Sequence, residues 1–79
     1  MIDKDGMKLF RKTDTTLVYI ASNQLTKKII GEESHCDLYI HVGRDKGNVK
    51  VYENNDATKI VHINMEVMQY ILKNAAADR

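Results

Sequence analysis

The chain has 79 residues, of which 43% are hydrophobic and 29% are charged, and its formal net charge is +1. We expect one domain over residues 1–79 with a modest core, and the near-neutral charge argues against a strongly basic nucleic-acid-binding protein. One cysteine excludes a disulfide within the chain, no apolar run approaches the ~20 residues that span a bilayer, and the first residues lack a signal-peptide core. We therefore expect a cytoplasmic protein that does not enter membranes, and a homodimer that supports the small core.

The first half of the chain predicts a hairpin. We expect residues 1–6 to fray. Residues 7–13 predict a strand, and Thr13-Asp14-Thr15 predicts a turn that leads into a second strand over residues 16–21. Simple alternation along the first strand places Met7, Leu9 and Arg11 on one face and Lys8, Phe10 and Lys12 on the other.

Residues 22–31 are ambiguous between a helix and a strand. Ser22 is a good N-cap, apolar residues recur at helical spacing, and Gly31 is a natural stop. We predict a short helix, with a strand as the alternative.

The second half predicts more strands and a helix. Residues 36–42 alternate most clearly, with Cys36, Leu38, Ile40 and Val42 on one side and Asp37, Tyr39 and His41 on the other. A turn at 43–48 leads to a return strand that begins at Val49, and a turn at 54–56 separates this strand from a last strand over 58–63. Asn64 then caps an amphipathic helix, whose end at 76–79 we expect to fray. The fold class is therefore α+β, mostly β: a small antiparallel sheet of about five strands with a C-terminal helix and a short inserted helix at 22–31.

No residue pattern predicts catalysis or a cofactor. Cys36 is flanked by His35 and Asp37, but neighbours on a strand point to opposite faces, so neither is placed as its base. The spacing of His35, His41 and His62 matches no metal-ligand pattern. We expect neither an enzyme nor a metal site.

Aromatic and basic residues interleave on the predicted sheet. Phe10 lies between Lys8 and Lys12, and the predicted strands also carry Tyr19, Tyr39 and Tyr52. Such residues can stack unpaired bases and neutralise phosphates. The alternative is that these rings pack a thin core.

The order of elements resembles the CsrA/RsmA family of RNA-binding translational regulators. Three stretches carry the likeness: Leu9-Phe10-Arg11-Lys12 with Leu17-Val18-Tyr19-Ile20; Leu38-Tyr39-Ile40-His41-Val42 with Lys46-Gly47-Asn48 and Val49-Lys50-Val51; and Ile60 through Ile71. Residues 21–36 would be an insertion in that family. The arginine with which the family begins its helix and grips RNA falls at Asn64 or Ile63 and has no counterpart.

The resemblance implies an interlocked homodimer with exchanged strands that binds single-stranded or loop RNA and modulates translation. By position, Leu9, Arg11 and Lys12 would contact RNA from one subunit, and Val61, His62 and Asn64 from the other. Lys8, Arg44 and Lys46 are additional candidates for phosphate contacts. The missing arginine and the near-neutral charge leave an alternative, a small interaction module or a phage- or plasmid-type inhibitor that docks on a host protein.

Overall fold

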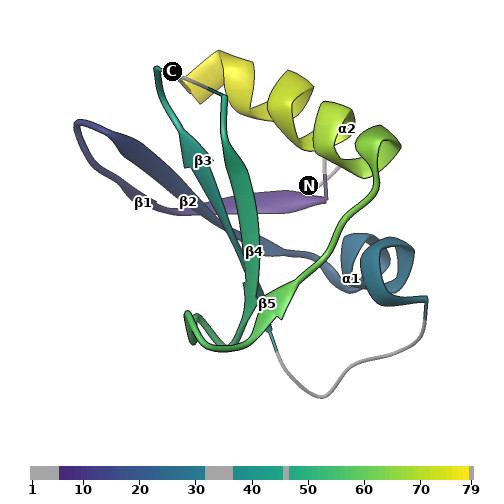
Figure 1. The fold of residues 1–79 in the computed structure, drawn as a ribbon. Coiled ribbons are helices and arrows are strands. Elements are labelled where there is room, and N and C mark those ends of the chain that lie inside the picture. Colours follow the sequence, from purple (N-terminus) through teal and green to yellow (C-terminus); the bar gives the residue numbers. More distant parts are fainter. Residues whose placement is uncertain (1–5, 32–36, 46, 79) are drawn as a thin grey trace.

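The structure, a computed structural model, describes residues 6–31, 37–45 and 47–78 (Figure 1). In chain order the elements are β1 (Met7–Lys12), β2 (Thr16–Ala21), α1 (Asn23–Ile30), β3 (Leu38–Gly43), β4 (Val49–Glu53), β5 (Ile60–Val61), α2 (Met65–Ala75) and the 3-10 turn η1 (Ala76–Asp78). The predicted α+β class is confirmed, including the inserted helix after β2. Cys36, predicted to begin the third strand, lies outside the described residues.

The strands form one antiparallel sheet in the order β1-β2-β3-β4-β5, so each strand pairs with its neighbour along the chain. The predicted last strand over 58–63 is shortened to Ile60–Val61. Its first residues belong to the preceding turn, because the Thr58 backbone N–H and hydroxyl both donate to the Asp56 carboxylate. Its last residues leave the sheet to lead into α2.

A β-bulge changes the faces of β1. Leu9 pairs with Tyr19, but the next paired residue is Arg11, opposite Val18, so Phe10 is the extra residue. A bulge reverses the alternation beyond it. Arg11 therefore shares a face with Lys8, and the prediction that grouped Arg11 with Met7 and Leu9 is wrong.

Capping residues set the bounds of α1. The Ser22 hydroxyl accepts a hydrogen bond from the Leu25 backbone N–H at 3.2 Å. Gly31 ends the helix in the left-handed region at φ 79°, where its N–H donates to the Lys27 carbonyl. A residue with a Cβ is strained in that conformation, which explains the glycine. The helical reading of 22–31 is thus confirmed.

The end of α2 has an anchor that the sequence pattern does not reveal. Alanines 75–77 offer little to pack, and fraying was expected at 76–79. In the structure Ala75 is fully buried, residues 76–78 form η1, and the buried Tyr19 donates its hydroxyl to the Asp78 carboxylate. This hydrogen bond ties the end of the helix to the middle of β2.

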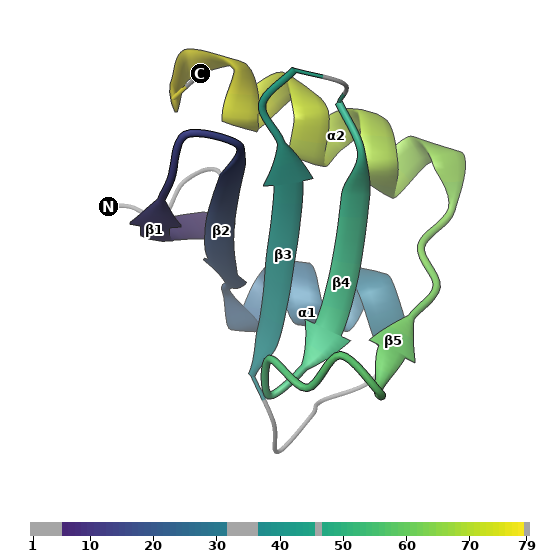
Figure 2. The same cartoon turned by 60° about the vertical axis from the view of Figure 1, so that its left-hand side comes forward.

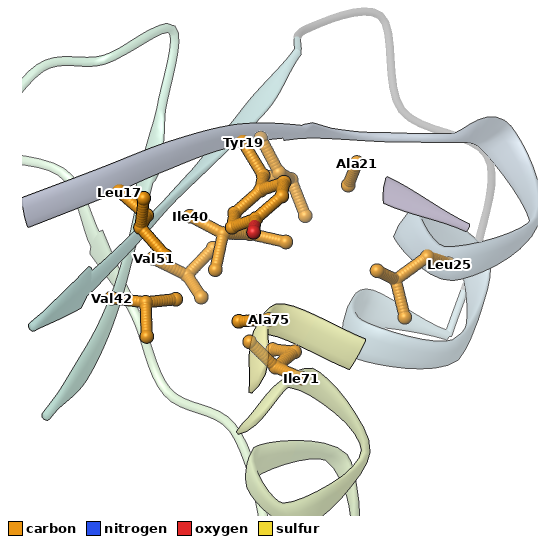
Figure 3. Packing of buried hydrophobic residues seen from close by; sticks show 10 residues of the cluster. Leu17, Tyr19, Ala21, Leu25, Ile40, Val42, Val51, Ile71 and Ala75 are labelled. Atoms are coloured by element: carbon orange, nitrogen blue, oxygen red, sulfur yellow. The ribbon is translucent and has the colours of Figure 1, made fainter. Parts of the chain in front are cut away.

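Both helices lie on one face of the sheet, and Figure 2 looks onto the opposite face with the helices behind it. The core between the sheet and the helices contains Leu17, Tyr19, Ala21, Leu25, Leu38, Ile40, Val42, Val51, Ile71 and Ala75 (Figure 3). Over residues 6–31, 37–45 and 47–78, no helix covers the other face. None of the described helices is long and apolar enough to cross a membrane.

Candidate nucleic-acid interface

The face of the sheet that points away from the helices is called the outer face. Strand alternation and register place on it Lys8, Phe10, Arg11, Val18, Ile20, Tyr39, His41, Lys50, Tyr52 and Ile60. Their strand neighbours Leu38, Ile40, Val42 and Val51 point inward and are buried. The same alternation that builds the core therefore assembles this second surface.

Four rings from three strands lie together on the outer face. Phe10 contacts Tyr39 edge to face, with 5.5 Å between ring centroids and an interplanar angle of 87°. His41 and Tyr52 form a second such pair at 5.1 Å and 76°. Tyr39 is the register partner of Tyr52, which joins the two pairs into one group. Phe10 is 49% exposed, and the other rings are half-buried, so each presents some of its surface to solvent.

Three cations lie on the same face as these rings, namely Lys8, Arg11 and Lys50. The Arg11 guanidinium carbon lies 5.7 Å from the centroid of Phe10, within the range of a cation–π contact. Lys8 and Lys50 are exposed, and Lys50 is the register partner of His41. The strand residues that define the outer face include no acidic side chain, so they combine aromatic surface with positive charge, and Asp45 lies in the turn beside them.

A pocket of about 430 Å³ opens beside the rings. The residues that line this outer-face pocket are Thr15, Thr16, His41, Gly43, Asp45, Asn48, Lys50 and Tyr52. His41 is held from one side, because its Nε2 shares a 2.8 Å hydrogen bond with the Asn55 side-chain oxygen. Asn54 and Asn55 both have positive φ, at 51° and 61°, which suits the tight turn between β4 and β5.

The candidate RNA contacts on β1 do not all share one face. Lys8 and Arg11 lie on the outer face, and both are exposed. Leu9 and Lys12 pair with Tyr19 and Leu17, which point into the core, so they lie on the opposite side of the strand. Leu9 is nevertheless 41% exposed, because β1 is the edge strand.

The candidates from the second group lie at the other edge of the sheet. Val61 is opposite Val51 and packs against the core, and His62 is exposed just after β5. Asn64 is the N-cap of α2, and its side-chain oxygen accepts from the Val67 N–H at 2.8 Å. Within one chain, three strands separate this group from β1. The structure therefore does not bring the two groups together.

The remaining candidates are the two basic residues of the turn between β3 and β4. The Arg44 Nη1 donates to the Thr13 carbonyl at 2.9 Å, which links this turn to the turn between β1 and β2. Its guanidinium is thus engaged in holding two turns together. Lys46 lies outside the described residues.

Sequence reasoning did not place His41 or the pocket in the candidate interface. The alternation of residues 36–42 already placed His41 beside Tyr39, and this signal pointed to the outer face. Tyr19, which was grouped with the other aromatic candidates, is instead part of the core. Burial and the hydrogen bond to Asp78 raise the pKa of its hydroxyl well above the ordinary value of 10.0.

Among the described residues, no three histidine, cysteine or acidic side chains come together in a way that could hold a metal ion. No protein-family model matches the sequence, and no curated protein or solved structure is significantly similar to it.

Proposed function

We propose that the chain binds single-stranded RNA on the outer face of its sheet. The observation that carries the proposal is a group of four partly exposed rings on a face that no helix covers in the described chain. The rings are Phe10, Tyr39, His41 and Tyr52, and the same face carries Lys8, Arg11 and Lys50. Unpaired bases stack on such rings, and each stacked base contributes roughly 1–3 kcal/mol.

The charge pattern supports RNA even though the net charge is only +1. Arg11 lies over Phe10 and Lys50 is the register partner of His41, so positive charge lies beside the rings, where the phosphates of a stacked strand would pass. Contacts to phosphate release counterions, so affinity falls as salt rises. A modest number of such contacts predicts weak to moderate binding at low salt rather than tight non-specific binding.

Fluorescence anisotropy with labelled single-stranded RNA of mixed sequence tests the proposal. The double variant Arg11→Gln with Lys50→Gln should weaken binding and reduce the slope of log affinity against log salt by about 1.4, since each lost contact to a single strand contributes about 0.7. The matched control is Lys27→Gln with Lys73→Gln, which removes the same charge from α1 and α2. If both pairs weaken binding equally, the attraction is only a general charge effect and the outer face is not the site.

Translational regulation by an interlocked dimer is a further part of the proposal, and it rests on the resemblance to the CsrA/RsmA family. In one chain Arg11 and Lys12 lie at the edge opposite Val61 and His62. A dimer that joins these edges would create the composite RNA site which the resemblance implies. Light scattering after size exclusion should then give twice the mass of one chain without RNA, and two chains plus the bound RNA in its presence; one chain in both conditions contradicts the dimer.

The exposed edge strand supports a second candidate, docking on a protein. Nearly all of β1 is exposed, including Leu9 at 41% and Phe10 at 49%, and edge strands accept an extended segment of another chain. Capture of a protein that Leu9→Lys abolishes and Tyr52→Val leaves unchanged would favour this candidate. Capture that Tyr52→Val abolishes and Leu9→Lys leaves unchanged would instead place the binding site on the outer face.

A further inference from the structure

The outer-face pocket continues the aromatic surface. His41 and Tyr52 belong both to the group of rings and to the pocket lining. Its volume of about 430 Å³ lies within the range of about 300–1,000 Å³ that is usual for small-ligand sites. A strand whose bases stack on the rings can therefore place its next base in the pocket.

The lining presents both donors and acceptors of hydrogen bonds to that base. The carboxylate of Asp45 only accepts hydrogen bonds, and the ammonium of Lys50 only donates them. Thr15, Thr16 and Asn48 can do either, so they adapt to the base that enters. The two charged groups cannot exchange roles, so they distinguish bases by where the donors and acceptors of the base lie.

From this chemistry we infer that the pocket selects a base with an exocyclic amino group and rejects uracil. The inference rests on the proposed function. Cytosine presents its N4 amino group as a donor, which suits the Asp45 carboxylate, and its N3 and O2 acceptors suit Lys50. Uracil presents O4 in place of the amino group, and its one Watson–Crick donor, N3–H, lies between the O2 and O4 carbonyls, so the Asp45 carboxylate can accept from it only with a carbonyl oxygen close beside it.

The pyrimidines give a matched comparison because their rings are the same size and stack similarly. Anisotropy at neutral pH and low salt would compare oligocytidylate with oligouridylate of equal length. We expect the wild-type protein to bind oligocytidylate about tenfold more tightly, in keeping with the discrimination of one well-placed polar contact. Asp45→Asn should bring the two affinities together, because an amide can accept from cytosine or donate to uracil.

The control variant is Asp14→Asn. Asp14 is exposed in the turn between β1 and β2 and does not line the pocket. The Asp14→Asn variant removes the same charge as Asp45→Asn, so both variants should bind all RNA slightly more tightly. Only Asp45→Asn should change the ratio of the affinities for oligocytidylate and oligouridylate. Thermal melting of each variant checks that both remain folded.

The outcomes separate this inference from the proposed function. Equal binding of both oligonucleotides by the wild type, or a preference that Asp45→Asn leaves intact, overturns the selectivity of the pocket while RNA binding stands. Absence of binding to either oligonucleotide overturns the proposed function and the inference with it.

Discussion

The two faces of the sheet differ in burial and chemistry although the same strands build both. On β3, Leu38, Ile40 and Val42 are fully buried beneath the helices, whereas Tyr39 and His41 are half-buried on the outer face. The buried core on the inner face is aliphatic apart from Tyr19, and the outer face carries aromatic and basic side chains. Since one face stabilises the fold and the other is proposed to bind RNA, substitutions at neighbouring residues should affect different properties.

The largest expected effect is on the inner face. Ile40 is fully buried at the centre of the core, so Ile40→Ala should lower the free energy of unfolding by about 2–5 kcal/mol through lost burial and the cavity left behind. In a domain this small, that loss leaves little stability. Urea denaturation followed by circular dichroism would measure it. A loss under about 1 kcal/mol would mean that the helices do not cover this face as described.

The next effect belongs to the neighbouring residue on the opposite face. Tyr39→Val keeps a good strand former but removes a ring, so RNA affinity should fall by roughly 1–3 kcal/mol, while the stability changes by less than about 1 kcal/mol. Anisotropy and urea denaturation of the same preparation give both numbers. The control is Tyr70→Leu, which removes a ring from α2 and should leave RNA affinity unchanged. A variant of Tyr39 that loses stability but not affinity would contradict the division between the faces.

Much of this division follows from local sequence signals. The alternation in 38–42 predicted which residues of β3 face the core, and Ser22, Gly31 and Asn64 marked helix ends because capping depends on the few nearest residues. These features need no knowledge of distant contacts, and the structure agrees with them.

Other features depend on pairing between distant residues. The bulge at Phe10 appears only when β1 is paired with β2, and it moves Arg11 to the outer face. The meeting of Phe10 with Tyr39 and the pocket between two turns require the register of several strands at once. The anchor between Tyr19 and Asp78 joins residues that are 59 positions apart. Simple alternation cannot reveal such contacts.

The hydrogen bond between Tyr19 and Asp78 offers a third prediction, which concerns the stability of the inner face. Asp78→Ala leaves the buried Tyr19 hydroxyl without its acceptor, which should cost about 1–3 kcal/mol of stability. If the hydrogen bond is the cause, Asp78→Ala should cost much less in a Tyr19→Phe background, where no hydroxyl is left unpaired. An equal loss of stability in both backgrounds would show that η1 stabilises the fold only by packing.

The same contact gives the stability a defined dependence on pH. Burial, and then the contact with Asp78, raise the pKa of Tyr19 above the ordinary value of 10.0. The unfolded chain therefore releases this proton first, so the contribution is fully present below pH 10 and is lost as the pH rises beyond it. Denaturation at increasing alkaline pH should show a decline that Tyr19→Phe reduces. If Tyr19→Phe loses as much stability at alkaline pH as the wild type does, other titrating groups cause the loss.

The smallest effect concerns Asn64, which the family resemblance places among the RNA contacts and the structure places at the cap of α2. Because its side-chain oxygen accepts from the Val67 N–H, Asn64→Ala should cost about 1 kcal/mol of stability, and Asn64→Ser should restore most of it by supplying another capping oxygen. Neither change should alter RNA affinity, since the residue lies beyond β5 and not among the outer-face rings. If Asn64→Ala and Asn64→Ser both weaken RNA binding, capping cannot be the reason, and the RNA surface must extend to the edge that the resemblance indicates. The one position thus distinguishes an RNA site confined to the outer face from a composite site shared between two edges.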